Sequence, residues 1–243
     1  MYLKLVRLIF AGAFIGAAVL GIAVAAVLIA FRDNTPVQPK SAPARAGSGD
    51  TPAGWRLLMS APILLNLVFF ALLAMISAGL YNYSVVALGA LYGTPVTIAN
   101  AALTGNLLWS AIGVLLGGVL VGRTTRHGLV ATIGLAAMGL FTAMVAEIDF
   151  STVALIGVMS LIGLFSGVIM PSRDMIVRAI TPPGSFGKVF GFVTTGFNIG
   201  GIVAPLMFGA IMDHGSPRLV FLTVAALSLV AILTVATRPR RPV

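Results

Sequence analysis

The feature that most constrains this chain is a set of long apolar runs without charge. A helix of about 20 apolar residues crosses a bilayer, and in hydrocarbon every backbone amide must find a partner inside its own element. Hydrophobic residues make up 59% of the 243 residues and charged residues only 9%, whereas soluble domains carry about 25% charged residues. The chain cannot cover itself with polar groups, so we expect it to lie in lipid. No run alternates strictly between polar and apolar residues, which argues against a membrane barrel.

Charged residues divide the apolar sequence into seven predicted spanning helices. The uncharged stretch 57–122 would form a straight helix of roughly 100 Å at 1.5 Å per residue, so it must contain a turn. Turn signals at Tyr81-Asn82-Tyr83 and Gly93-Thr94-Pro95 lie near its middle, and we expect a short interfacial piece between two spans there. The predicted spans are 8–31, 58–80, 97–121, 129–146, 150–172, 189–212 and 219–237.

Basic residues indicate which loops face the cytoplasm, because cytoplasmic loops are enriched in Lys and Arg. With seven spans, most of them fall on one side, in 32–57, 122–128, 173–188 and the C-terminal tail. We therefore expect the linker 32–57 and the C-terminus in the cytoplasm, with the helices in the plasma membrane, the inner membrane of a bacterium. Lys4 and Arg7 fall on the other side, which suggests that helices before this N-terminus are missing. The basic loops lack interleaved aromatics, so the net charge of +9 does not indicate nucleic-acid binding.

The segment 32–57 differs in kind from the other loops. It is rich in Pro, Ala, Gly and Ser and poor in bulky apolar residues, which is typical of a flexible linker. One helix precedes it and six follow it. We interpret residues 1–31 as the last helix of one bundle, 58–238 as a complete second bundle, and 239–243 as a cytoplasmic tail.

Two motifs resemble those of the major facilitator superfamily. Residues 118–128 read Gly-Val-Leu-Val-Gly-Arg-Thr-Thr-Arg-His-Gly and are similar to the family's cytoplasmic motif Gly-x-x-x-Asp-Arg-x-Gly-Arg-Arg. Gly122 stands where the family has aspartate, and Thr125 replaces a glycine, so the carboxylate of that pattern is missing. Residues 171–191 and 198–205 resemble the family's segment between its tenth and eleventh helices.

The resemblance implies an all-α, polytopic membrane bundle: the six-helix C-terminal bundle of such a transporter with one helix before it. Members have two six-helix bundles with the substrate site between them. We therefore expect a half or truncated secondary transporter that moves a small solute or drug-like molecule by alternating access. Its partners would be the lipid bilayer and either a missing N-terminal bundle or a second copy of the chain. The alternative is a non-transporting remnant, or a docking partner of another permease.

The chain offers little for catalysis or metal binding. It has no cysteine, and its two histidines, His127 and His214, lie far apart in the sequence. We therefore expect no enzyme, no metal site and no cofactor. No titratable residue lies deep within a predicted span, so this half supplies no evident proton carrier.

Polar and aromatic residues within spans indicate where a solute cavity lies, because lipid penalises polar groups. Serine and threonine can bond to their own helix, so the asparagines carry more weight as substrate or interhelix contacts. The candidate cavity residues are Asn66, Phe70, Tyr81, Asn106, Trp109, Ser160, Ser166 and Asn198. The resemblance favours those on the family's seventh and tenth helices, which are Asn66, Phe70, Ser160 and Ser166.

Charged residues at one membrane face are candidates for a cytoplasmic gate. They are Arg123, Arg126, Arg173, Asp174, Arg178 and Lys188. Asp174 and Arg178 are four residues apart and are expected to pair on one helical turn. According to the gate hypothesis, this cluster pairs with the loop arginines or with the other bundle in one state of the transport cycle. The simpler interpretation is orientation charge at the lipid headgroups.

Glycines recur at a spacing of four residues, which lets helices approach closely in lipid. These pairs are 12/16, 113/117, 118/122, 163/167 and 196/200. Pro205 falls inside a predicted span and should kink it.

Overall fold

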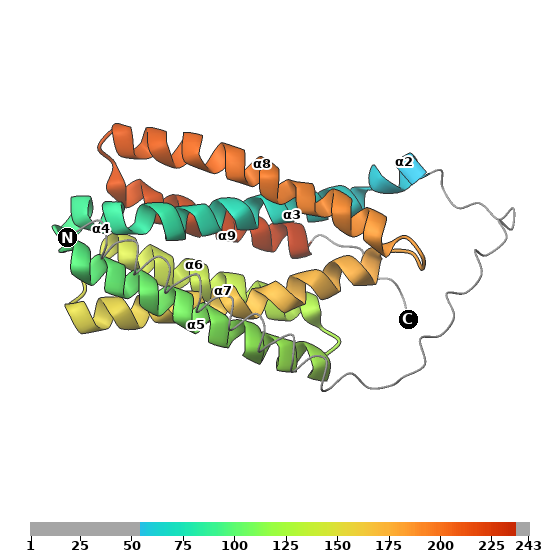
Figure 1. Cartoon of the computed structure of the whole chain (residues 1–243), viewed down its shortest axis with the longest axis horizontal. Coiled ribbons are helices and arrows are strands. Elements are labelled where there is room, and N and C mark those ends of the chain that lie inside the picture. The colour runs from blue at the N-terminus through green and yellow to red at the C-terminus, as the bar shows by residue number, and fades with distance from the viewer. Residues whose placement is uncertain (1–53, 237–243) are drawn as a thin grey trace, which may run out of the picture. The chain divides into compact units, whose positions relative to one another are not determined.

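A computed structural model of the chain describes residues 54–236, and every regular element within that range is a helix. The helices are α2 (Gly54–Leu58), α3 (Ala61–Ala78), a π-helical turn (Gly79–Tyr83), α4 (Ser84–Tyr92), α5 (Val96–Arg123), α6 (His127–Glu147), α7 (Thr152–Ile180), α8 (Phe186–Asp213) and α9 (Pro217–Ala236) (Figure 1). The predicted span 8–31, most of the linker 32–57 and the tail 239–243 lie outside the described residues.

Six helical segments of the described range are long and apolar enough to cross a membrane. They are Ala61–Tyr92, Val96–Arg123, His127–Glu147, Thr152–Ile180, Phe186–Asp213 and Pro217–Val235. The all-helical membrane bundle predicted from the sequence is therefore confirmed for this part of the chain.

The first described span runs without a break from α3 through the π-helical turn into α4. The prediction of a turn at Tyr81–Tyr83, with a separate interfacial piece after it, is therefore wrong. A break inside the bilayer would leave backbone amides unsatisfied, whereas a π-helical turn keeps them bonded within the helix. The Tyr83 hydroxyl also donates a hydrogen bond of 3.2 Å to the carbonyl oxygen of Pro205, which ties this turn to α8.

The chain reverses at the second predicted turn signal instead. Gly93 adopts φ +65°, a left-handed conformation, and its N–H bonds to the carbonyl of Gly89. Glycine has no Cβ to oppose that conformation, so it ends the helix here. Pro95 follows, and α5 begins at the next residue.

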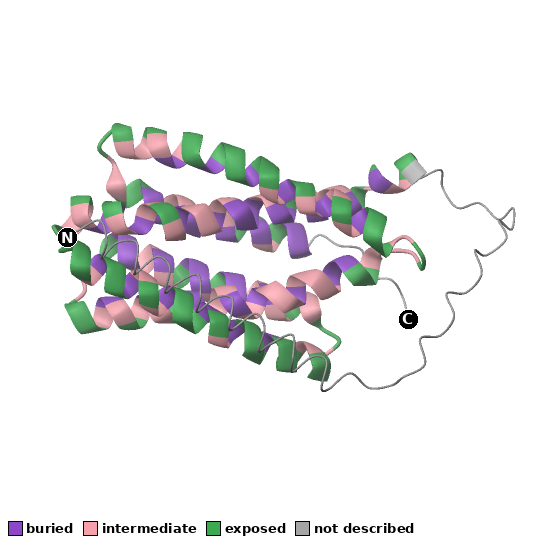
Figure 2. Ribbon diagram, viewed as in Figure 1, coloured by how far each residue is buried: buried purple, intermediate pink, exposed green. Residues whose placement is uncertain are grey.

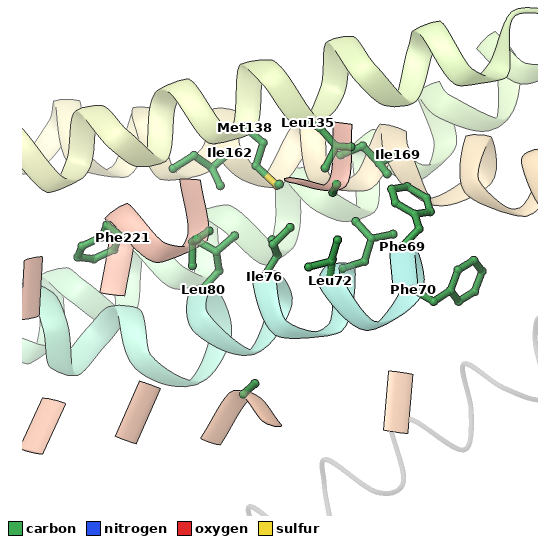
Figure 3. Packing of buried hydrophobic residues seen from close by; sticks show 14 of the residues in the cluster. Phe69, Phe70, Leu72, Ile76, Leu80, Leu135, Met138, Ile162, Ile169 and Phe221 are labelled. Atoms are coloured by element: carbon green, nitrogen blue, oxygen red, sulfur yellow. The ribbon is translucent and has the colours of Figure 1, made fainter. Parts of the chain in front are cut away.

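The core of the bundle lies where α3 faces α6, α7 and α9. Leu72 and Ile76 of α3, with Leu80 of the π-helical turn, point toward Met138 of α6 and Ile162 of α7 (Figure 3). Their side chains are between 0% and 9% exposed. Phe69 and Phe70 point to different sides of α3, with Phe69 toward Ile169 (Figure 3). The two rings therefore contribute to different surfaces of the helix.

Glycines bring two pairs of helices into backbone contact. The most extensive helix contact joins α5 to α7, and the next joins α3 to α8. A Cβ added at any of six glycines would overlap the neighbouring helix: Gly113 and Gly117 of α5, Gly163 and Gly167 of α7, and Gly196 and Gly200 of α8. The spacing of four residues thus has its predicted packing role at these three pairs. Gly118 and Gly122 instead have open space beside them, and 12/16 lies outside the described residues.

Large apolar side chains cover the outside of the bundle. Figure 2 shows exposed residues along much of α5 and α8. Examples are Leu107, Leu115 and Leu116 of α5, and Ile202 and Leu206 of α8. A protein in water would bury such surfaces, whereas lipid solvates them.

The loops divide the charged residues between the two ends of the bundle. The α5–α6 and α7–α8 loops lie at the same end as α2, on the right in Figure 1. That end carries Arg56, Arg123, Arg126, Arg178 and Lys188. The opposite end carries Glu147, Asp149, Asp213 and Arg218. The described loops therefore reproduce the separation of charge on which the predicted orientation depends.

Candidate functional site

A narrow cleft that extends from the middle of the bundle toward its basic end brings side chains from four helices together. Leu73, Ile76 and Ser77 come from α3, Met138 from α6, Ser166, Ile169, Met170 and Arg173 from α7, and Phe197 from α8. Its space of about 20 Å³ exceeds only slightly the roughly 10–15 Å³ that one water molecule needs. The lining is mostly apolar, with two hydroxyl groups and a single charged side chain.

The charged group of the cleft, Arg173, owes its position to the path of α7. The sequence predicted a span that ends at 172, but α7 continues to Ile180. Arg173 therefore lies about 10 Å before the end of the helix, at 1.5 Å per residue. Pro171, inside α7, packs against Gly117 of α5. Because two residues along a helix are separated by about 200°, Arg173 points away from α5, toward α3 and α8.

Two aromatic rings hold the guanidinium of Arg173. Its central carbon lies 4.6 Å from the centre of the Phe70 ring and 5.0 Å from that of Phe197. The two rings meet edge to face, with centres 5.2 Å apart. Cations at such distances are attracted to the ring faces, more strongly when water is excluded. The Arg173 side chain is only 12% exposed, so it sits inside the bundle rather than at its surface.

One edge of the same guanidinium is held by a carboxylate. The Nε–H of Arg173 donates to Oδ1 of Asp174 over 2.9 Å. Within residues 54–236 this is the only hydrogen bond or ion pair of Arg173. Its two terminal nitrogens therefore carry donors that no described protein group uses. Since the rings and Nε fix the plane of the group, those donors have a defined direction.

The predicted cavity residues divide between this cleft and other places. Ser166 lines the cleft, and Phe70 supports its arginine. Asn106 donates from Nδ2 to the carbonyl of Met159 over 2.9 Å, a bond between α5 and α7, and its Oδ1 is buried without a partner among the described residues. Asn66 is buried and donates to the carbonyl of Pro62 in its own helix.

The remaining cavity candidates lie outside the cleft. Ser160 lies beside Gly105, at the contact of α7 with α5. Tyr81 is partly buried against the core, Trp109 is 42% exposed, and Asn198 is exposed. The structure thus brings Phe70 and Ser166 together with Arg173 and leaves the others apart.

The predicted gate residues share one end of the bundle but do not form one network. The expected pair of Asp174 with Arg178 is absent from the described residues, because the Asp174 carboxylate turns to Arg173 instead. Arg123, Arg126, Arg178 and Lys188 are exposed. Within 54–236 none of these four takes part in an ion pair. No latch between Asp174 and the arginines of the α5–α6 loop is present in the described residues.

The opposite end of the bundle is closed by different contacts. Glu147, at the end of α6, forms an ion pair with Arg218 at the start of α9, with Nε of Arg218 3.1 Å from Oε1. The Tyr92 hydroxyl donates to the carbonyl of Val145 over 2.9 Å. A shallow depression of about 170 Å³ lies beside Tyr92, between the α4–α5 and α6–α7 loops. These contacts join the turns at this end rather than forming a site of convergent donors.

Sequence reasoning placed Arg173 at a loop and did not select Phe197 or Met170. A signal was present, because Ser166, Met170 and Arg173 are spaced by four and three residues and so share one face of a helix. The missing step was the length of α7. Because the predicted span ended at 172, Arg173 was assigned to the solvated loop after it.

The fold defines a multi-pass membrane protein built as a transporter-type helix bundle. A family model, the Major Facilitator Superfamily, matches residues 67–243. The chain belongs to this superfamily, whose members are membrane transporters rather than enzymes. The matched region contains five of the six described spans whole and most of the first, in agreement with the C-terminal half expected from the motifs. A search of curated proteins found no match.

Proposed function

We propose that this chain acts as one half of a secondary transporter, which moves a small solute by alternating access together with a second six-helix bundle. The observation that carries this proposal is the cleft between α3, α7 and α8 in a bundle of a transporter family. In such proteins the solute site lies near the middle of the membrane at the interface of two repeats. A single bundle contributes only one wall of that site.

The small buried share of α5 and α8 supports docking of a second bundle. In their most apolar windows, only 22% of α5 and 28% of α8 is buried, against 56% of Ala61–Tyr92. Gly118 and Gly122 of α5 have open space beside them, and small residues at this spacing allow another helix to approach closely. We propose the exposed faces of α5 and α8 as the contact with the second bundle, for which a second copy of this chain is the first candidate.

The contacts of α7 support movement during transport. The backbone of this helix lies close to α5 and α6 along much of its length, but it approaches α3 and α8 closely at few positions. Separation of α7 from α3 and α8 would therefore widen the cleft while breaking few close backbone approaches, although buried side chains of α3 and α7 would lose contact. We further propose that the basic end faces the cytoplasm at the plasma membrane, as the enrichment of Lys and Arg favours.

Cysteine accessibility tests alternating access without knowledge of the solute. The sequence contains no cysteine, so Ser166→Cys provides a single thiol in the cleft. In proteoliposomes we expect an impermeant maleimide to label it from the outside in both orientations of the protein. Ser228→Cys, buried in α9, is the unreactive control, and Ser151→Cys, in the α6–α7 loop, should react from one side only. Labelling of Ser166→Cys from one side only contradicts alternating access and favours the non-transporting alternative.

A flux assay tests transport itself. Proteoliposomes with the full chain alone, and with two copies joined in tandem, are loaded with benzoate, glucose or ethidium as anionic, neutral and cationic probes. We expect flux above empty liposomes only when two bundles are present. Ser166→Trp, which fills the cleft, should abolish that flux, whereas Leu161→Trp on the exposed side of α7 should not.

A further inference from the structure

We infer that the cleft recognises an organic anion, a carboxylate or similar acid on an apolar body, through the terminal nitrogens of Arg173. The inference rests on the proposed function, since it names the class of solute that the cleft takes. It goes beyond the sequence prediction, which placed no charged group inside the bundle and favoured no charged solute.

The first argument is the geometry of the donors. Arginine presents five N–H donors in a planar fork, and two parallel bonds from its terminal nitrogens match a carboxylate. Asp174 uses only the Nε edge, and the rings of Phe70 and Phe197 contact the guanidinium at 4.6 and 5.0 Å. The group is thus oriented before any ligand arrives, which lowers the entropy cost of binding.

The second argument is the surroundings of the fork. Arg173 is the only charged group among the residues that line the cleft, and two hydroxyls, those of Ser77 and Ser166, are the other polar side chains there. The rest of the wall is apolar, with Leu73, Ile169 and Phe197 among its residues. An acid group at the arginine would leave its apolar body along this wall. A sugar would meet too few hydrogen-bonding partners, and a cation would be repelled by Arg173.

The third argument concerns the size of the cleft. Its present space admits about one water molecule, so an anion with an apolar body needs α7 to move away from α3 and α8. Few backbone positions of α7 lie close to α3 or α8, and Arg173 contacts the rings of Phe70 on α3 and Phe197 on α8. Opening the cleft takes Arg173 away from the two rings. A carboxylate bound at its terminal nitrogens stays with Arg173 when the cleft opens. Binding and opening are therefore coupled through the same side chain.

The test measures binding to the purified full chain in phosphatidylcholine nanodiscs by isothermal titration calorimetry. The probes are benzoate and octanoate, with benzamide as the uncharged match of benzoate. We expect saturable binding of at least one acid and none of benzamide. Arg173→Gln should weaken acid binding on the order of ten- to a hundredfold, the range for loss of a charge-assisted hydrogen bond. Arg178→Gln, the same charge change on the exposed part of α7, should alter it by less than about twofold, because an exposed charge is screened.

Two further variants keep the test decisive. Arg173→Lys retains the charge but loses the fork, so acid binding should fall while circular dichroism and thermal unfolding remain normal. Asp174→Asn removes the competing negative charge and should tighten acid binding. Absence of acid binding, equal affinity for benzamide, or an equal loss in Arg178→Gln overturns the inference.

The source of the anion is separated by lipid competition. Nanodiscs with added phosphatidylglycerol abolish benzoate binding if a lipid headgroup occupies the fork, and leave it unchanged if the ligand is a soluble acid. Both outcomes support an anion site at Arg173. Flux of glucose or ethidium without any acid binding would reject this inference and leave the transport proposal standing. Acid binding without flux of any probe would support this inference and reject the transport proposal.

Discussion

The guanidinium carbon of Arg173 lies 4.6 Å from the centre of the Phe70 ring, so a cation of α7 rests on an aromatic side chain of α3. The ring of Phe197, from α8, contacts the same group at 5.0 Å. The backbone of α7 approaches these two helices closely at few positions. The glycine contacts join α5 to α7 and α3 to α8. The two rings therefore connect α7 with α3 and α8, which these glycine contacts leave separate.

This relationship predicts an energetic coupling between Arg173 and Phe197. In a double-mutant cycle with Arg173→Met and Phe197→Leu, we expect a coupling of roughly 1–2 kcal/mol, the upper part of the range for cation–aromatic contacts, because the guanidinium is largely shielded from water. The measurement is the free energy of unfolding in detergent. A matched cycle of Arg173→Met with Phe141→Leu, whose ring stacks on Phe165 instead, should be additive. Additivity in both cycles would show that the contact contributes nothing to stability.

The close packing of α5 on α7 predicts that two Gly→Ala substitutions in α7 differ in their effect on stability. A Cβ at Gly163 would overlap the backbone carbonyl of Asn106, which cannot move aside as a flexible side chain can. Gly163→Ala should therefore lower the stability of the bundle by about 1–3 kcal/mol, the usual cost of overpacking. Its control is Gly157→Ala in the same helix, where the space is open and alanine should be neutral or slightly stabilising.

Thermal unfolding followed by size-exclusion chromatography distinguishes these two variants. The midpoint of Gly163→Ala should fall clearly below that of the natural chain, and that of Gly157→Ala should not. Equal midpoints would mean that α5 and α7 are farther apart in the membrane than in this structure.

The end of the bundle opposite the basic loops offers a test of a single hydrogen bond. The Tyr92 hydroxyl donates to the carbonyl of Val145 over 2.9 Å and links α4 to α6. Tyr92→Phe keeps the ring and should lower the free energy of unfolding by about 0.5–1.5 kcal/mol. Tyr81→Phe is the matched control, because the Tyr81 hydroxyl makes no hydrogen bond with the described residues. Similar losses in both variants would remove the specific role of Tyr92.

Much of this fold follows from simple sequence rules, because lipid allows few alternatives. Apolar length located the six described spans, and glycine spacing identified three glycine pairs that lie at two helix contacts. The two failures are alike: turn-like residues in one case and a charged residue in the other were taken to end a helix. Tyr81–Tyr83 continues as a π-helical turn, and α7 extends past Arg173 to Ile180. In a bilayer a helix continues wherever ending it would expose backbone amides, even through residues that favour turns in water.

The candidate site was harder to predict than the fold for a related reason. Phe70 and Ser166 were selected because each lies in a predicted span and is aromatic or polar. Arg173 joins them only because α3, α7 and α8 converge. Convergence is a tertiary property, and spacing along one helix does not reveal it. Asn106 illustrates the opposite case. Its bond to the Met159 carbonyl accounts for its buried position by helix packing, without a contact to substrate.

The arrangement of the loops predicts a topology that single cysteines can test in intact cells. Thr125→Cys places a thiol in the exposed α5–α6 loop at the basic end, and Ser151→Cys places one in the exposed α6–α7 loop at the other end. The positive-inside rule predicts that the basic end is cytoplasmic. An impermeant maleimide should therefore label Ser151→Cys in intact cells, and Thr125→Cys only after the membrane is permeabilised. Because α6 alone separates the two positions, opposite reactivity requires that this helix crosses the membrane. Equal labelling of both in intact cells would contradict the crossing, and the reverse pattern would invert the proposed orientation while leaving the bundle intact.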